Sequence, residues 1–97
     1  MLAKILIKRR IPQELQHQLL PVLTQLREKV VAQPGYISGE TLRNFEDPED
    51  YLVISTWRSV ENWQAWFNSP ERKALHSEIE ELLPKPTQYS IYLLGEF

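Results

Sequence analysis

Three tryptophans and a histidine lie close together in the segment from Trp57 to His76. Tryptophan is costly to expose to water, so these clustered rings indicate either an aromatic core or a pocket wall that faces a flat ligand. A neutral imidazole beside such a pocket could act as a base or bind iron near neutral pH. Trp63 and Trp66 are three residues apart on one predicted helix face, so we expect one to anchor the helix and Trp66 to line a cavity.

Three further side chains are candidates for ligand contact. Phe67 would extend the aromatic wall, while Asn44 or Tyr51 would orient an oxygenated ring by hydrogen bonding. The alternatives remain open, because strand tyrosines are also common at sheet edges and dimer interfaces. His76 could equally be a half-buried helix residue that is hydrogen-bonded to a neighbour. The other histidine, His17, lies between two glutamines and is expected at the surface.

Other residue types argue against metal, thiol and serine chemistry. The chain has no cysteine, which excludes a disulfide framework, a thiolate nucleophile and a cysteine-ligated metal. The acidic residues in segments 46–50 and 78–81 lack a spacing that converges on one ion, so we expect no metal site. Nothing in the sequence brings Ser55 or Ser59 next to a histidine, as a catalytic triad requires.

Length and charge limit the class of protein. The 97 residues predict one domain over 1–97, small enough that a partner subunit would help to bury apolar surface. The net charge is −2 and no basic stripe interleaves with aromatic residues, so we expect no nucleic-acid partner. The order of apolar and basic residues at the start is the reverse of a signal peptide, and no stretch is long enough to span a membrane. A cytoplasmic protein without membrane contact is therefore predicted.

Hydrophobic periodicity predicts the elements that position these residues. Apolar residues alternate in 2–10, recur at helical spacing in 12–32, and alternate again in 36–45 and 51–58. Ser59 is a good N-cap for a short helix that ends at Phe67, and Ser69 caps a second helix that stops before Pro84. A last strand is predicted over 88–96. The order is βαββαβ with a broken second helix.

This order predicts an α+β, ferredoxin-like fold, in which helices cover one face of a four-stranded antiparallel sheet. Seven residues are candidates for the other face, and their apolar character requires a cover. They are Tyr36, Leu42, Tyr51, Val53, Tyr89, Ile91 and Leu93. A second copy of the sheet would supply that cover most simply, so we predict a homodimer.

Three segments, in this order, carry a resemblance to a known family. They are Gln33-Pro34-Gly35-Tyr36, the segment 51–59 that ends in Trp57-Arg58-Ser59, and the later Trp66, Ser69 and His76. Together they resemble the antibiotic biosynthesis monooxygenase domain, a dimeric α+β barrel family, over nearly the whole chain. The resemblance implies that Trp57 packs between sheet and helix. It also implies three kinds of activity: cofactor-independent oxygenation of phenolic or quinol-like compounds, haem degradation, or none known.

This sequence resembles the haem-degrading branch of the family only in part. Its tryptophan, followed ten residues later by the histidine that ligates iron, resembles Trp66 and His76. That branch also has an asparagine on its first strand, whereas this sequence has Ile5 to Lys8 there and no asparagine before Asn44. This difference argues against haem oxygenation.

The leading hypothesis is a homodimeric monooxygenase that uses oxygen on an aromatic, quinol-like small molecule without a cofactor. His76 would be the general base, Trp66 and Phe67 the walls, and Asn44 or Tyr51 the orienting groups. One alternative is a haem-binding or haem-degrading module with His76 as the iron ligand. The other is a non-catalytic dimer that binds a small ligand.

Overall fold

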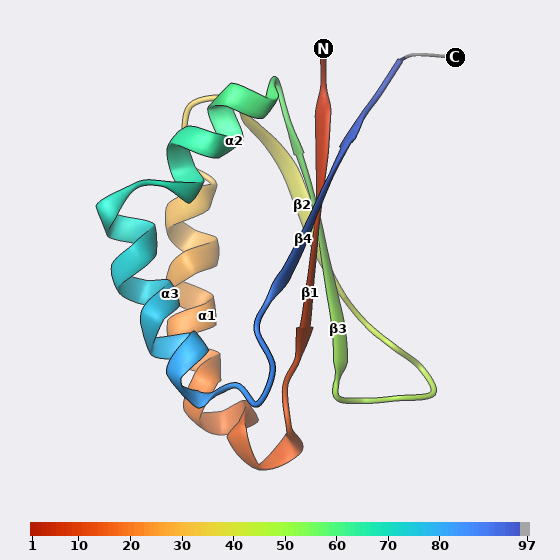
Figure 1. Cartoon of the computed structure of the whole chain (residues 1–97), viewed down its shortest axis with the longest axis vertical. Coiled ribbons are helices and arrows are strands. Elements are labelled where there is room, and N and C mark those ends of the chain that lie inside the picture. Colours follow the sequence, from red (N-terminus) through yellow and green to blue (C-terminus); the bar gives the residue numbers. More distant parts are fainter. Residues whose placement is uncertain (96–97) are drawn as a thin grey trace.

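A four-stranded antiparallel sheet forms one layer of the protein, and all the helices lie on one side of it (Figure 1). The computed structural model describes residues 1–95. Its elements, in order, are β1 (Ala3–Arg10), a 3₁₀ turn (Gln13–Leu15), α1 (Gln16–Val30), β2 (Tyr36–Arg43), β3 (Asp50–Trp57), α2 (Val60–Phe67), α3 (Pro70–Leu82) and β4 (Gln88–Leu93). This confirms the predicted α+β, ferredoxin-like order; Glu96, the predicted end of the last strand, lies outside the described residues.

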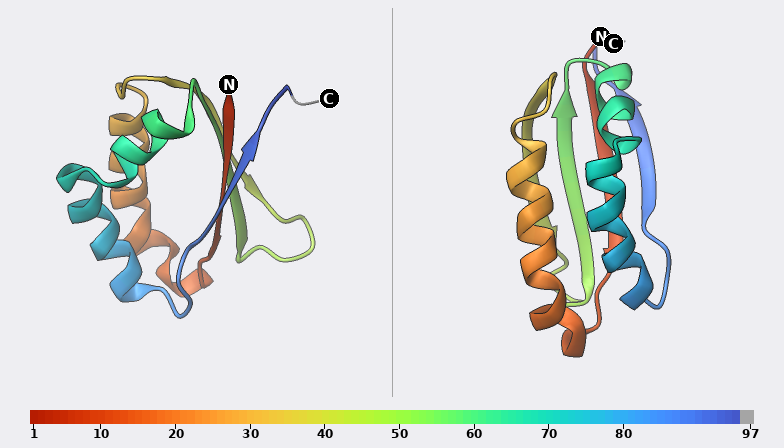
Figure 2. Two further views of the ribbon diagram at one scale, coloured as in Figure 1. Left: turned by 45° about the horizontal axis from the view of Figure 1, so that its top comes forward. Right: turned by 90° about the vertical axis from the view of Figure 1, so that its left-hand side faces the viewer.

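The sheet order is β2-β3-β1-β4, so the first and third strands form its centre. Helices α1 and α3 lie side by side over the sheet in both views of Figure 2, and α2 continues from the end of β3. Two serine caps start the helices that carry the site. Ser59 Oγ accepts a hydrogen bond from the Asn62 amide at 3.1 Å, and Ser69 Oγ accepts one from the Arg72 amide at 3.2 Å.

Trp57 lies at the centre of the core next to the sheet. Its side chain is 1% exposed, its ring meets the edge of Tyr36 at 5.4 Å between centroids, and its Nε1 donates to Ser55 Oγ at 3.1 Å. Ala3 and Ile5 of β1 are fully buried against the same cluster. The implied packing role of Trp57 is confirmed. A second cluster, around Leu19 and Ile79, joins α1 to α3.

The predicted faces of the strands need a correction. In the register of the sheet, Ile5 lies opposite Ser55 and Ile91, and Ile7 lies opposite Val53 and Tyr89. Directly opposed residues point to the same face, so Tyr51, Val53, Tyr89, Ile91 and Leu93 share the helix side with the buried Ala3 and Ile5. Tyr36 also faces that side, where it packs on Trp57. Their assignment to the uncovered face was wrong, because alternation separates two faces without showing which one the helices cover.

Of the seven assigned residues, Leu42 alone lies on the face opposite the helices. The pairing places Leu6, Leu52, Ile54 and Tyr92 there with it. Leu42 is 44% exposed and Tyr92 is 58% exposed. This second set, named here the open face, is apolar at its centre and has no covering element among residues 1–95 (Figure 1).

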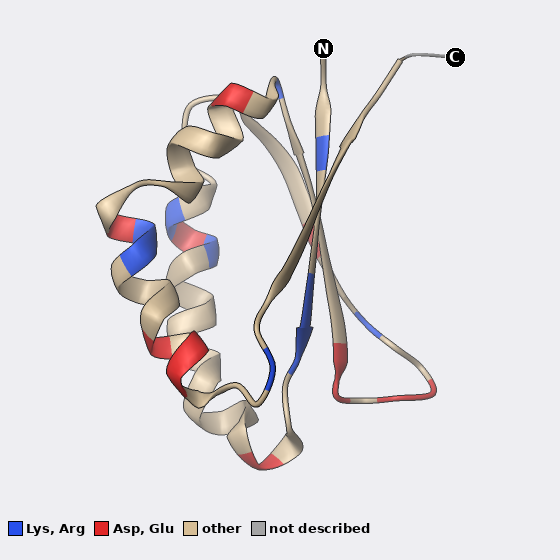
Figure 3. Cartoon of the chain, in the orientation of Figure 1, with Lys and Arg blue, Asp and Glu red and all other residues tan. Residues whose placement is uncertain are grey.

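Charges are distributed over the outside of the fold. Figure 3 shows acidic and basic residues mixed along the helices and an acidic turn between β2 and β3. Arg10 forms ion pairs with Asp47 at 2.7 Å and with Glu49 at 3.2 Å across that turn. None of the helices in residues 1–95 has the length and apolar character needed to cross a membrane.

Candidate functional site

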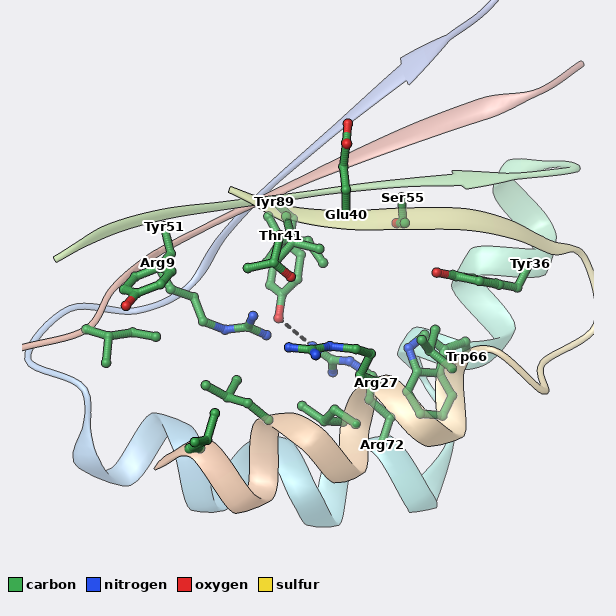
Figure 4. Close-up of a pocket in the computed structure, with 18 of the residues that line it drawn as sticks. Arg9, Arg27, Tyr36, Glu40, Thr41, Tyr51, Ser55, Trp66, Arg72 and Tyr89 are labelled. Atoms are coloured by element: carbon green, nitrogen blue, oxygen red, sulfur yellow. Dashed lines mark hydrogen bonds between the residues drawn. The ribbon is translucent and has the colours of Figure 1, made fainter. Parts of the chain in front are cut away.

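A cavity of about 800 Å³ lies between α1 and the helix side of the sheet (Figure 4). Aliphatic side chains from α1, from β1 and from the residue after β1 form much of its wall, among them Leu20, Leu23, Leu26, Ile7 and Ile11. The volume falls within the range of roughly 300 to 1,000 Å³ that is usual for small-molecule sites. Helix α1 packs mainly on α3 through Leu19 and Ile79, and the space lies between α1 and the strands.

Aromatic rings form one end of this cavity. Trp57, Trp63, Trp66 and Tyr36 all contribute to its lining there. Trp63 is 6% exposed and Trp66 is 7% exposed, so both rings belong to the core and to the cavity wall. The prediction assigned the cavity to Trp66 and an anchoring role to its neighbour, whereas the structure places both in the wall. Flat, rigid walls of this kind suit a planar ligand.

A cluster of polar side chains lies on the wall between β4 and α3. The Tyr89 hydroxyl accepts a hydrogen bond from Arg72 Nη2, and it lies 3.0 Å from His76 Nε2. Arg72 is 8% exposed, its Nη1 donates to the Phe67 carbonyl at 3.2 Å, and its guanidinium lies 4.2 Å from the centre of the Phe67 ring. These contacts hold the Tyr89 hydroxyl at the cavity wall (Figure 4).

The electrostatics of the cluster favour neutral groups at Tyr89 and His76. Burial, and then the charges of Arg72 and Arg9, lower the pKa of His76 from 6.5 to about 4, although Glu80 opposes this shift. Burial also raises the pKa of the Tyr89 phenol. Near neutral pH a neutral imidazole can therefore accept the hydrogen bond of a protonated Tyr89. Glu80, 3.4 Å from His76 Nε2, accepts hydrogen bonds from the amide and hydroxyl of Thr87.

Arg9 extends from β1 into the cavity (Figure 4). Its Nε is buried and has no hydrogen-bond partner among residues 1–95. Burial lowers the pKa of Arg9, and the positive charge of Arg72 lowers it further. Two desolvated guanidinium groups thus lie near one phenol, Tyr89.

The structure brings together some of the predicted site residues and separates others. Trp66 and Tyr51 line the cavity, near its two ends. Phe67 and His76 do not line it, because they lie behind Arg72 and Tyr89.

Asn44 lies apart from the cavity, in the turn after β2. Its Nδ2 donates to Asp50 Oδ2 at 3.0 Å and its Oδ1 accepts from the Glu46 amide at 2.8 Å. Asn44 therefore does not orient a ligand in the cavity of its own chain. His17 is exposed, as predicted, and lies at the rim of the cavity.

The sequence reasoning missed Arg9, Arg72 and Tyr89 as site residues, although the pattern contained a signal for two of them. Arg9 continues the alternating series that includes the buried Ala3 and Ile5. Arg72 lies seven residues before the buried Ile79, on the same stripe of α3. A charged residue in a buried position of a periodic pattern marks a polar contact in the interior.

The structure does not support the haem ligation predicted from the sequence. The only candidate ligand from the sequence, His76, lies outside the cavity lining and directs Nε2 to Tyr89 and Glu80. Among residues 1–95, no three histidine, aspartate or glutamate side chains gather into a metal-binding group.

Comparisons with known proteins identify a matching family and relatives that are similar over part of their length. Residues 3–78 match the family described as antibiotic biosynthesis monooxygenase. The chain is 33% identical over 57 residues to the 42.8 kDa protein in the whiE locus of Streptomyces coelicolor. This match covers 59% of the chain and 14% of that protein. The chain is 40% identical over 37 residues to a heme oxygenase (mycobilin-producing) of Mycobacterium tuberculosis, covering 38% of this chain and 35% of that protein. The chain thus spans only a small part of these relatives.

Solved structures share the fold at low sequence identity. A conserved protein from Methanosarcina mazei Go1 superposes with a TM-score of 0.87 at 20% identity, covering 95% of this chain and 91% of that one. SnoaB from Streptomyces nogalater, described as a cofactor-independent oxygenase, superposes with a TM-score of 0.78 at 11% identity, covering 99% and 94%. At these identities the likeness shows the fold alone.

Proposed function

The chain belongs to the antibiotic biosynthesis monooxygenase family, and from this premise we propose that it oxygenates an electron-rich aromatic small molecule, such as a quinol, without a metal or flavin. One observation carries the proposal: a cavity of about 800 Å³ combines an aromatic end with the Tyr89–Arg72 pair on its wall. SnoaB, which shares the fold, is a cofactor-independent oxygenase. That description supports the absence of a cofactor here.

The apolar lining would exclude water from a bound ring and strengthen electrostatic interactions inside the cavity. Trp63 and Trp66 would form one wall against the ring plane. Tyr89 would accept a hydrogen bond from a hydroxyl group on the ring, since its own proton is donated to His76 and Arg72 holds the phenol from behind.

The chemistry begins when the bound ring loses a proton to solvent, and the peroxide formed later takes a proton back. The positive charge of Arg72, next to the Tyr89 hydroxyl, stabilises the resulting anion, which lowers the pKa of the ligand. The anion gives one electron to oxygen, and the two radicals combine into a peroxide. Loss of water from the peroxide leaves one oxygen atom as a new carbonyl, so that O₂ and a ring CH₂, as in an anthrone or in the keto tautomer of a quinol, become H₂O and C=O. The substrate itself is the reductant.

His76 acts differently in this scheme from the base expected from the sequence. It does not line the cavity, and a pKa of about 4 makes it a weak proton acceptor near neutral pH. We assign it a positioning role: its neutral imidazole holds the Tyr89 hydroxyl. Tyr89 is the residue placed to touch the substrate.

Pairing of two chains through the open face completes the proposal. Leu6, Leu52 and Ile54 lie at the centre of that face, with Leu42 and Tyr92 exposed around them. A second copy of the same face would remove this surface from water in an isologous contact. We propose a homodimer on this ground.

Oxygen uptake against a panel of quinols, naphthols and anthrones tests the function. Uptake above the uncatalysed rate is expected for at least one compound, with one atom of ¹⁸O₂ in the product and no effect of a metal chelator. A panel that gives no uptake above background would leave a non-catalytic protein that binds small ligands. A Soret band that shifts on addition of haem, and that His76→Ala abolishes, would instead support the haem-binding alternative.

A further inference from the structure

Arg9 has an unused hydrogen-bonding capacity inside the cavity. Its Nε is buried without a partner, and neither Arg9 nor Arg72 forms an ion pair among residues 1–95. A guanidinium presents five N–H donors in a planar fork that matches a carboxylate. A buried donor and a buried charge without a partner are each unfavourable.

Arg72 differs from Arg9 in this respect. Its Nη1 donates to the Phe67 carbonyl and its Nη2 to the Tyr89 hydroxyl, and its guanidinium stacks over the Phe67 ring. These contacts explain Arg72 as a support for Tyr89. Arg9 is supported less fully: Tyr89 contacts its guanidinium, but its buried Nε has no partner among residues 1–95, and its side chain enters the cavity from the opposite side (Figure 4).

The cavity is positively charged although the chain as a whole carries a net charge of −2. Arg9, Arg27 and Arg72 all contribute to its lining. Among residues 1–95, the one carboxylate residue in the lining is Glu40. The register pairs it with Ile54 on the open face, and Figure 4 shows its side chain directed away from the cavity. An anionic group on the ligand would balance the buried positive charge.

The register of β1 gives the order of the groups along the cavity. Ala3 lies opposite Trp57, Ile7 opposite Tyr89, and Arg9 opposite Tyr51. At a rise of about 3.3 Å per residue, the backbone of Arg9 lies about 7 Å beyond the Tyr89 position, on the side away from Trp57. A ligand with its ring at the tryptophan end and its reacting oxygen at Tyr89 would therefore carry an acidic group toward Arg9.

We propose that the ligand is a planar aromatic acid whose carboxylate pairs with Arg9, while its ring lies against Trp63 and Trp66. This inference rests on the proposed function for the ring and the reacting oxygen. It adds a specificity-determining residue and a substrate class: polycyclic carboxylic acids are bound in preference to their neutral analogues.

Isothermal titration of the full chain with 2-naphthoate and 2-naphthamide tests the preference. The two probes share the ring and are redox-inert, but only 2-naphthoate is charged at pH 7.5. We expect 2-naphthoate to bind the wild type at least tenfold more tightly. Equal affinities for the two probes would overturn the proposal.

Variants of Arg9 separate a specific contact from general attraction. Arg9→Gln should weaken 2-naphthoate at least tenfold and leave 2-naphthamide unchanged, while Arg9→Lys should restore part of the preference. Arg58→Gln, at an exposed arginine just after β3, is the matched control and should change neither affinity. Because Arg9→Gln removes a buried charge without a partner, the variant should fold, and a thermal melt checks this. Preserved preference in Arg9→Gln would exclude Arg9 as the carboxylate site.

Oxygen uptake distinguishes a failure of this inference from a failure of the proposed function. The substrates are 1,4-dihydroxy-2-naphthoate and 1,4-dihydroxynaphthalene, which differ in the carboxylate alone. If both react equally and Arg9→Gln is without effect, the oxygenase stands and the acid site fails. If 2-naphthoate binds through Arg9 but no quinol consumes oxygen, the acid site stands and the oxygenase fails.

Discussion

The Tyr89 hydroxyl lies 3.0 Å from Nε2 of His76 and so links the last strand to helix α3. The same hydroxyl accepts a hydrogen bond from Arg72, whose guanidinium is fixed on the Phe67 ring and carbonyl. One phenol is therefore held from two sides, at the point where the cavity changes from aromatic to cationic.

Replacing Tyr89 by phenylalanine should remove the proposed contact with substrate while keeping the ring that packs on Trp63 and Phe67. We expect the turnover rate for a quinol to fall by about a hundredfold or more, with a stability loss of about 1 to 3 kcal/mol because the Arg72 donor loses its partner. Oxygen uptake and urea unfolding measure the two effects. Tyr92→Phe, on the same strand but on the open face, is the control and should retain the wild-type rate.

His76→Gln should reduce the turnover rate far less than Tyr89→Phe, because glutamine can still accept the Tyr89 hydrogen bond. A general base in direct contact with substrate contributes about a hundredfold to ten-thousandfold. Equal losses of kcat in His76→Gln and Tyr89→Phe would therefore identify His76 as the general base. The comparison requires kcat, measured at saturating quinol, so that binding effects are kept apart.

Stability should decrease as the pH falls from about 6.5 to about 4, because burial depresses the pKa of His76 to about 4. The unfolded state binds this proton first, near its ordinary pKa of 6.5, so the free energy of unfolding is highest above that pH. The free energy of unfolding should fall by at most about 3 kcal/mol through His76. This loss is absent above pH 7. Arg72, Arg9, Tyr89 and Glu80 are the titratable groups that face the imidazole.

Urea unfolding of the wild type and His76→Gln between pH 4 and pH 8 measures this dependence. The variant should lose the part of the slope due to His76, whereas His17→Gln, at an exposed histidine of α1, should keep it. A wild-type slope that persists in His76→Gln would assign the dependence to other groups.

Gly35→Ala should destabilise the fold strongly. Gly35 has a φ of 84°, and a Cβ there would overlap the side chain of Asn62 in α2. We expect a loss of about 2 to 5 kcal/mol, from backbone strain and overpacking together. Gly95 has a φ of 92° but open space around it, so Gly95→Ala carries strain alone and should cost under about 2 kcal/mol. Comparable losses of unfolding free energy in Gly35→Ala and Gly95→Ala, measured by urea unfolding, would show that Asn62 moves aside without an energetic cost.

Ile54→Glu should separate the proposed dimer. Ile54 lies opposite Leu6 and Glu40 on the open face, so a glutamate there would place a charge in the contact and a like charge beside Glu40. Light scattering after size exclusion should give a dimer for the wild type and a monomer for the variant at low micromolar concentration. Gln64→Glu adds the same charge at an exposed position of α2 and should remain dimeric. A monomeric wild type would exclude the proposed dimer.

The sequence by itself determined the order and approximate limits of the elements. Alternation and helical spacing are local patterns, and the serine caps at Ser59 and Ser69 act through hydrogen bonds to amides three residues later, so each element could be recognised without its neighbours. Local helical spacing also indicated Trp66 as part of a cavity wall, whereas the packing role of Trp57 came from the family resemblance.

Tertiary structure decided which face of each strand the helices cover and which polar groups meet in the interior. Tyr89 and Arg72 are 17 residues apart in the sequence, and Arg9 comes from the first strand. Their positions depend on strand pairing, and a shift of one residue in that pairing would exchange the faces of the whole strand. No local pattern contains the pairing register, and for this reason the sequence pointed to His76 while the structure placed Tyr89 and Arg9 at the cavity.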